Sequence, residues 1–539
     1  MPIGLRDSTD ILVGSERALS PEETSHRPRQ SRWAWGAVLV AAILVFAAKP
    51  WALIQPQLWA EDGTIHLLEN EAFSLNTLLH PYRGYLHTLP RLIAWTASRT
   101  SDVAHWPAFY NTAAFLVAIG LLVRMASSRL DLPEKPWLIL AFVLTANTAE
   151  VFLNLTNLHW LTSFFLLAQV LIAPARSRWQ FFADLALLVL IGLTGPFVLV
   201  YLPLFIWRWW RERDRYSEVV LLAAAVCAAI QLYFVLTEPL VVAAPLESLH
   251  FEKLWTALGK RLIAWPLLGP KIAMMLPDFA LAVLGLGVVG LLGFAALRSH
   301  PERTRRIQVL AAFGLITFAC VYRVRPDTWA DPAMENGDSY FFIPRVLLAW
   351  LVIWNFNAQP RIVGWMIRLL CFGGLVVNFA GYIKPTPPNF HWVLHCETIR
   401  SGQPADIPTL PEGWILRYTG RSYYAEATRG WYGPEFDAHA SWRWSSGDAT
   451  LRLFTYYAGP QRLSFSLRGI QAQQVTVRLG KAVIGTLQVD THLREFTFTF
   501  PHLPLGPSEL TLISDQPGKT EPTPATRKLA FALYRLSTR

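Results

Sequence analysis

The chain has 539 residues, of which 53% are apolar, 13% aromatic and only 16% charged, and its mean hydropathy is +0.30. These shares lie above the apolar fraction and below the charged fraction of ordinary soluble domains, so the composition indicates a membrane protein and not a wholly soluble one. The net charge of +10 comes from basic residues that are scattered and form no single stripe. It is therefore no indication of nucleic-acid binding, and no nucleic-acid partner is expected.

Apolar and polar residues are segregated along the chain. Long apolar runs extend from about Trp33 to Ile383, whereas the two ends of the chain are as polar as ordinary soluble protein. We therefore expect a cytoplasmic N-terminal segment (residues 1–32), a transmembrane α-helical domain (33–383) and an extracytoplasmic domain (384–539).

The length of each apolar run is compared with the thickness of a bilayer. A helix rises 1.5 Å per residue and must cross roughly 30 Å of hydrocarbon, and by this measure about eleven runs are spans. They lie near residues 33–54, 106–127, 136–153, 158–175, 181–194, 196–207, 217–237, 278–297, 307–323, 341–357 and 361–383. Gly192, Gly195 and Pro196 interrupt one stretch that is too long for one span and too short for two, which predicts a re-entrant pair of short helices.

The basic residues provide an independent test of orientation, because short cytoplasmic loops carry an excess of Lys and Arg. If the N-terminus is cytoplasmic, every predicted inside loop is basic. The residues concerned are Arg124, Arg129, Lys135, Arg176, Arg178, Arg208, Arg211, Arg213, Arg215, Arg298, Arg303, Arg305, Arg306 and Arg361. We read the positive charge partly as this topology pattern.

An acidic pair, Glu61 and Asp62, directly follows the first predicted span on its outward side. Adjacent carboxylates at the edge of the hydrocarbon repel each other and are poorly solvated, so at least one of them is expected to have a raised pKa, which suits a general base. The alternative is that the pair caps the next helix, with Asp62 and Gly63 forming a turn.

Further polar residues flank the outward ends of other predicted spans. Asn154, Asn157 and His159 sit in or beside a very short connection, and His159 alone is better explained as a satisfied interface histidine. Arg323 ends one span, and Arg345 lies at the start of the next. Arginine at an interface can bind phosphate through paired hydrogen bonds or extend toward lipid headgroups.

Four short motifs in the outward segments carry a resemblance to a known superfamily. They are Trp59-Ala60-Glu61-Asp62-Gly63, Gly84-Tyr85-Leu86-His87, Asn157-Leu158-His159-Trp160 and Tyr340-Phe341-Phe342-Ile343-Pro344-Arg345. With these motifs, residues 33–383 resemble bacterial envelope glycosyltransferases of the GT-C superfamily. The resemblance implies location in the bacterial inner (cytoplasmic) membrane as a multi-pass protein.

The resemblance also implies a reaction. An acidic residue of the first outward loop acts as base, so either Asp62 or Glu61 would deprotonate an acceptor hydroxyl while a polyprenyl phosphate leaves the anomeric carbon of the donor sugar. General-base catalysis by a positioned carboxylate contributes ~10²- to 10⁴-fold. The donor phosphate would be bound by one of three arginines, and three other residues of these motifs complete the expected substrate-binding set. These residues are Arg345, Arg323 and Arg91, with His87, His159 and Tyr340.

The expected partners are a polyprenyl-phosphate-linked sugar donor, a glycan or lipid acceptor and membrane lipid. No carboxylate cluster with clear metal spacing is present, so no cofactor is expected, although Glu61 with Asp62 can hold a divalent cation. The four cysteines suggest neither a disulfide framework nor a metal site.

Beyond Ile383 the pattern changes from helical to strand-like. Pro385, Pro387 and Pro388 mark a linker, and segments 463–467, 475–479 and 496–500 alternate apolar and polar residues, as half-buried strands do. We expect an antiparallel β-sandwich of jelly-roll type that resembles carbohydrate-binding-like domains of envelope glycosyltransferases. Four aromatic residues either stack on sugar rings or, as the favoured interpretation, fill the core: Trp431, Tyr432, Trp442 and Trp444.

Two other classes of protein stay open. A flippase or transporter of a lipid-linked sugar also needs many spans and intramembrane cations, but it would line a route to both leaflets with polar groups. Here the polar groups lie in the predicted outward segments, which argues against such a route. No internal repeat is evident either. A membrane scaffold that only presents the sandwich would leave Glu61 and Asp62 replaceable.

Overall fold

The computed structural model describes most of the chain. The described residues are 21–237, 255, 258–298, 302–323, 337–357, 361–402, 405–418, 423–436, 440–455, 461–501, 503, 506–520 and 527–538. Side chains before Arg32 lie outside this description.

Helices make up the first part of the chain. They are α1 (Pro21–Ala48), α2 (Trp51–Ile54), η2 (Asp62–Leu67), α3 (Leu68–Phe73), η3 (Ser74–Leu79), α4 (Thr88–Thr100), η4 (Val103–His105), α5 (Trp106–Ala126), α6 (Lys135–Leu144), α7 (Leu158–Leu171), α8 (Arg178–Gly192), α9 (Phe197–Glu212), α10 (Arg215–Thr237), η6 (Leu258–Ala264), α12 (Trp265–Leu268), α13 (Pro270–Met275), α14 (Asp278–Leu297), α15 (Arg303–Arg323), α17 (Ser339–Ile353), α18 (Arg361–Phe379), η7 (Trp392–His395) and α19 (Cys396–Arg400).

Within the described residues, five helices are long and apolar enough to cross a membrane. They are Val103–Ala126, Arg215–Thr237, Asp278–Leu297, Arg303–Val321 and Arg361–Phe379. Shorter apolar helices accompany them, including α6, α7 and α17. The membrane character of this part is thus supported, whereas the count of about eleven spans stays a prediction.

The predicted interruption near Pro196 is present as a break between α8 and α9. Gly195 lies in the left-handed region at φ +87, and a Cβ atom there would lie 2.9 Å from Cβ of His159. Glycine is therefore required for both the turn and the close approach of α7. The two helices pack against α10.

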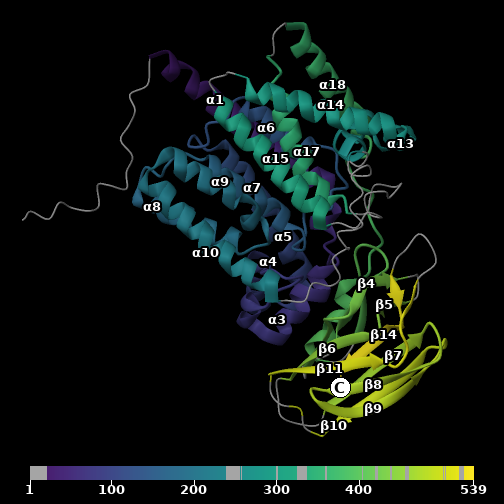
Figure 1. The fold of residues 1–539 in the computed structure, drawn as a ribbon. Coiled ribbons are helices and arrows are strands. Elements are labelled where there is room, and N and C mark those ends of the chain that lie inside the picture. Colours follow the sequence, from purple (N-terminus) through teal and green to yellow (C-terminus); the bar gives the residue numbers. More distant parts are fainter. Residues whose placement is uncertain are drawn as a thin grey trace, which may run out of the picture.

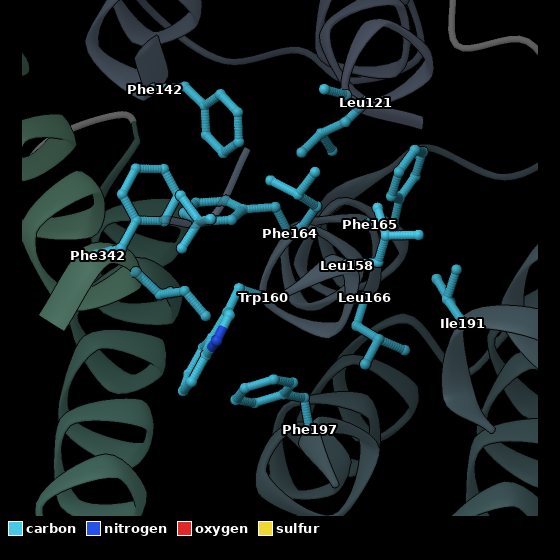
Figure 2. Close-up of a cluster of buried hydrophobic side chains, with 14 of the residues drawn as sticks. Leu121, Phe142, Leu158, Trp160, Phe164, Phe165, Leu166, Ile191, Phe197 and Phe342 are labelled. Carbon is cyan, nitrogen blue, oxygen red and sulfur yellow. The ribbon is translucent and has the colours of Figure 1, made fainter. Parts of the chain in front are cut away.

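Helix α7 is the centre of the helical part. Thirteen of its fourteen residues are buried, and α5, α8, α9 and α17 pack around it. Figure 2 shows the cluster: Phe164 of α7 lies edge-on to Phe142 of α6 at 5.0 Å, and Trp160 lies 5.2 Å from Phe197 of α9. The edge-to-face pair of Phe164 and Phe142 adds to the stabilisation from burial.

The two ends of α5 make different polar contacts. At one end, Arg124 of α5 and Arg129 donate to the carboxylate of Asp184 at 2.7 and 2.6 Å. Toward the other end of α5, Asn111 donates to the carbonyl of Gln57, shortly before the acidic pair. Arg124 and Asn111 are about 20 Å apart along the helix axis at 1.5 Å per residue. The predicted inside arginines and the predicted outward loop therefore lie at opposite ends of α5.

Strands make up the last part of the chain. They are β1 (Ala405–Thr409), β2 (Trp414–Tyr418), β3 (Tyr423–Ala427), β4 (Trp431–Phe436), β5 (Ser441–Ser445), β6 (Asp448–Thr455), β7 (Gln461–Gly469), β8 (Gln473–Leu479), β9 (Ala482–Val489), β10 (Arg494–Phe500), β11 (Gly506–Ser514), β12 (Lys519–Thr520), β13 (Lys528–Leu529) and β14 (Phe531–Thr538). The three predicted strand segments lie in β7, β8 and β10, which confirms an all-antiparallel domain.

Two five-stranded antiparallel sheets form the sandwich, in the orders β10-β7-β14-β5-β4 and β3-β6-β11-β8-β9. Alternate residues of both sheets, such as Leu453, Phe465 and Leu510, build one buried core. In Figure 1 the sandwich lies beside the end of the helical part that carries α3, and β3 contacts α3. The finer assignment to the jelly-roll type stays a prediction.

The four aromatic residues singled out in this domain have different environments. Trp431 is fully buried against Phe531, and Tyr432 is buried and donates to the carbonyl of Lys528. Trp442 is half-buried and stacks on Tyr534 at 5.4 Å, and Trp444 is half-buried on the same strand. The core interpretation therefore holds for Trp431 and Tyr432.

Residues 385–418 link the two parts and pack with the helices. Trp392, Cys396, Ile399, Leu410 and Leu416 are buried in the same hydrophobic cluster as the helical core, while the sandwich has a core of its own. The hydrophobic packing therefore continues past the predicted boundary at residue 384 and ends with β2.

Candidate functional site

The acidic pair lies where the chain turns from the first helices into η2. Ala60 is in the left-handed region at φ +40, which is strained for a residue with a Cβ atom. Lys49, just after α1, lies over the ring of Trp59 with its Nζ 4.4 Å from the ring centroid. The turn directs Asp62 inward and leaves Glu61 nearer the surface.

Asp62 is fully buried and receives hydrogen bonds from a distant turn. Its Oδ1 accepts from both the backbone amide and the hydroxyl of Thr156 at 2.7 Å, and its Oδ2 accepts from the amide of Leu155 at 3.3 Å. Burial raises the pKa of Asp62 to about 7, although the hydrogen bonds from Thr156 and Leu155 oppose the shift and the nearby charge of Glu61 adds to it. The carboxylate is therefore close to half-ionised at neutral pH and fixed in orientation.

The turn bonded to Asp62 belongs to an irregular segment, residues 145–157, that connects α6 to α7. Most of residues 151–155 are buried outside any helix, so their backbone groups need polar partners. Lys49 donates to the carbonyl of Phe152 at 3.2 Å, and Asn154 donates to that of Glu150 at 2.7 Å. Asp62 is one of several side chains that form hydrogen bonds with the backbone groups of this segment.

Glu61 forms the accessible side of the acidic pair. Its Oε1 accepts from the hydroxyl of Tyr82 at 3.2 Å and lies 3.7 Å from Nη2 of Arg83. The side chain of Arg83 is 43% exposed, and its Nε donates to the hydroxyl of Tyr82 at 3.0 Å. The guanidinium of Arg83 thus places a positive charge beside Glu61 and Tyr82, at the partly exposed side of the site.

Histidines cluster beside the acidic pair. His87 lies between His66 of η2 and His159 of α7, with ring centroids 5.8 and 5.5 Å away, and it stacks on Tyr85 at 4.8 Å. Burial lowers the pKa of His66 to about 3, helped by the charge of Arg91, and burial also lowers the pKa of His87. These two imidazoles are therefore neutral at pH 7.

Several nitrogens of this cluster are buried and have no hydrogen-bond partner within the described part of the chain. They are Nδ1 of His66, both ring nitrogens of His87, and Nε and Nη2 of Arg91. Nδ1 of His159 is 2.9 Å from the carbonyl of Thr156, so it carries the proton and leaves Nε2 as an acceptor. Unpaired buried polar groups are costly, and a polar ligand or water at this place would satisfy them.

Arg91, which was expected to bind the donor phosphate, forms an ion pair within the protein instead. It is fully buried in α4, forms an ion pair with Glu69 of α3 and donates to the hydroxyl of Thr77. His80 also contacts the same Glu69 carboxylate at 3.3 Å. The ion pair accounts for one face of the guanidinium and leaves only Nε and Nη2 for a ligand.

Arg345 is buried as well, in the middle of α17. It pairs with Asp338 and donates to the carbonyl of Ala146, and it lies over the ring of Trp265 at 4.3 Å. Asp338 in turn accepts from the amide of Thr148 at 2.8 Å. Arg345 and Asp338 therefore stabilise the same irregular segment that Asp62 holds from the other side.

The remaining predicted residues are placed as follows. Tyr340 is half-buried and meets Trp160 edge-on at 5.0 Å. Arg323 is the last residue of α15, and its side chain lies outside the described residues. The structure thus brings Asp62, Glu61, His87 and His159 into one neighbourhood, with Arg91 on its inner side.

Some residues of this neighbourhood were not singled out from the sequence. Thr156 and His66 contact or adjoin the acidic pair, and Arg83 lies at its mouth. Glu150 is another, because its carboxylate accepts from the backbone amide of Ser339 at 3.3 Å. His66 was detectable in principle, since it lies four residues after Asp62 on one helical face. Thr156 was not, because its contact with Asp62 spans 94 residues.

Among the described residues, no group of three or more His, Cys, Asp or Glu side chains is placed to hold a metal ion. The arrangement offers a carboxylate near half-ionisation, an exposed guanidinium and neutral imidazoles. It is suited to proton transfer and to binding of hydroxyl or phosphate groups.

Comparisons with known proteins add little to this site. No protein-family model matches the chain, and no curated protein matches it. A solved structure with similarity is TmCBM61 in complex with β-1,4-galactotriose, at 10% identity and a TM-score of 0.15, covering 22% of this chain and 87% of that one.

The Arg91–Glu69 pair generates a test of whether Arg91 stabilises the fold or binds substrate. Arg91→Met leaves the Glu69 carboxylate buried without its guanidinium, which is expected to cost about 3–5 kcal/mol of folding free energy. Thermal unfolding in lipid nanodiscs measures the loss. Arg99→Met is the matched control, because Arg99 lies on the same helix, is exposed and contacts Ser74. A variant R91M as stable as R99M would contradict the stabilising role of the Arg91–Glu69 pair.

Proposed function

We propose that this protein is a membrane glycosyltransferase of GT-C type that transfers a sugar from a polyprenyl-phosphate donor to an envelope glycan or lipid acceptor on the extracytoplasmic face. The observation that carries the proposal is Asp62. It is a buried carboxylate with a pKa of about 7, held in one orientation by Thr156 and Leu155. A base of this pKa is both free to accept a proton and strong enough to do so near neutral pH.

In the proposed reaction Asp62 takes the proton of the acceptor hydroxyl. The hydroxyl oxygen forms a bond to the anomeric carbon of the donor sugar, the bond from that carbon to the phosphate oxygen breaks, and the electron pair leaves with the polyprenyl phosphate. Because Asp62 is fully buried, the acceptor must displace part of its cover to reach Oδ2, the oxygen with the longer hydrogen bond.

Other residues of the site supply binding. Arg83, which lies 3.7 Å from Glu61, is assigned to the departing phosphate, where positive charge stabilises the developing negative charge. Arg345 and Arg91 pair with buried carboxylates, so they are less available to bind the donor phosphate. The neutral imidazoles of His66 and His87 each provide one donor and one acceptor, a combination that suits sugar hydroxyls.

Substitution of the two acidic residues tests the base. Purified protein in lipid is assayed for sugar transfer from a pool of polyprenyl-phosphate sugars. Asp62→Asn is expected to lower the rate by ~10²- to 10⁴-fold because the general base is lost. Glu61→Gln, which keeps its hydrogen bond with Tyr82, is expected to retain most of the activity.

Asp338→Asn is the matched control for a purely structural role of Asp62, because Asp338 is a buried carboxylate that holds the same irregular segment through Thr148. Equal losses in D62N and D338N would contradict the base assignment. Transfer unaffected by D62N would do the same, and no transfer from any donor would favour the flippase or the scaffold.

The pH dependence follows from the pKa of Asp62. A base works when it is deprotonated, so log(kcat/KM) is expected to rise with pH below about 7 and to level off above it. Thr156→Val removes a hydrogen bond that lowers this pKa, so the rising limb should move to higher pH by roughly one unit. Thr64→Val is the control, because that hydroxyl contacts the carbonyl of Ala60 and not Asp62. A limb in T156V that stays in place or moves to lower pH would contradict the assignment.

A further inference from the structure

Residues 385–418 are attached by several independent contacts to the segment that carries the acidic pair and to residues 102–103 before α5. The side-chain amide of Gln57 donates to the carbonyl of Pro388 at 3.0 Å and accepts from the amide of Phe390 at 2.8 Å. The indole of Trp392 donates to the carbonyl of Val103 at 2.9 Å. Both oxygens of Asp102 accept from Arg400.

The closest contact is made by the β1–β2 hairpin. Leu410, between the two strands, donates its amide to the carbonyl of Leu58 at 2.9 Å, and its carbonyl accepts from the amide of Ala60. The hairpin thus adds a strand-like bridge to Trp59, two residues before Glu61. These bonds fix the two backbone groups on either side of Trp59, directly before the strained conformation of Ala60.

Side-chain packing continues this contact into η2. Leu416 of β2 is fully buried, and a Cβ atom added to Gly63 would lie 3.4 Å from it. Gly63 follows Asp62 directly, so Leu416 lies against the backbone of the first turn of η2. At its other side the hairpin is bound to the sandwich, because Arg417 donates to the carbonyl of Tyr534 in β14.

We infer that the β1–β2 hairpin is a positioning element for Asp62: Leu410 and Leu416 hold residues 58–63 in the conformation that directs the Asp62 carboxylate to Thr156. Ala60 has a conformation that its own sequence disfavours, so an outside contact must maintain it, and the hairpin supplies that contact. The hairpin also connects the site mechanically to the sandwich. The consequence for catalysis, though not the positioning itself, rests on the proposed function.

Weakening the contact should release the segment and expose Asp62. In Leu416→Ala, water gains access near Gly63, and the burial that raises the pKa of Asp62 is reduced. The other groups that act electrostatically with Asp62 are Glu61 of the same segment, Lys49 after α1 and Tyr110 of α5, and the substitution changes none of them.

Hydrogen exchange of the full-length protein in nanodiscs tests the positioning without any assay of activity. L416A is expected to speed exchange of the amides of Ala60 and Thr156 by at least tenfold, because their acceptors become mobile. The pH profile of transfer is the second readout: the rising limb should move to lower pH, and kcat should fall more than KM rises. Leu416→Val, a milder truncation, should show smaller changes in the same direction if L416A does not fold.

Leu510→Ala is the matched control, since Leu510 is an equally buried leucine of the sandwich core that lies outside the hairpin. Unchanged exchange at Ala60 and Thr156 in L416A and L416V, or equal acceleration in L510A, would overturn the positioning role. Accelerated exchange in a protein without transferase activity would support the positioning and reject the proposed function, so the two failures are distinguishable.

Discussion

The non-helical segment 145–157, in which residues 151–155 are buried, places a strong physical demand on this structure. Its backbone amides and carbonyls lie among apolar helices and require polar partners there, because an unsatisfied group in such surroundings costs several kcal/mol. Asp62 supplies acceptors for Leu155 and Thr156, and Lys49 and Asp338 serve neighbouring positions. The first loop and the connection before α7 are consequently one unit.

This demand explains why a carboxylate is placed where it is difficult to ionise. Burial raises the pKa of Asp62, whereas three hydrogen bonds favour its charged form, and together they bring the pKa to about 7. Glu61, only one residue away, faces Tyr82 and Arg83 at the surface instead. Adjacent residues of one chemical type thus acquire different surroundings from the direction in which the Ala60 turn points them.

Local features of the sequence predicted the long apolar helices, the break at Gly195 and the strands of the sandwich. Each depends on nearby residues: apolar length, a glycine before a proline, or strict alternation. The partners of these residues were not predictable. Thr156 reaches Asp62 across 94 residues, Arg91 turned out to pair with Glu69, and the hairpin at Leu410 reaches Leu58 from far along the chain. Such contacts depend on how the helices pack against one another. The pattern of apolar and polar residues along the chain does not specify that packing.

The most direct test of the account is a cryo-EM structure of the protein in lipid nanodiscs with a polyprenyl-phosphonate sugar, a donor analogue that cannot transfer. The account predicts density for the sugar beside Asp62 and the histidines His66 and His87, with the phosphonate against Arg83. Density for the analogue only at a position remote from Asp62, or on a path that opens to both leaflets, would contradict it.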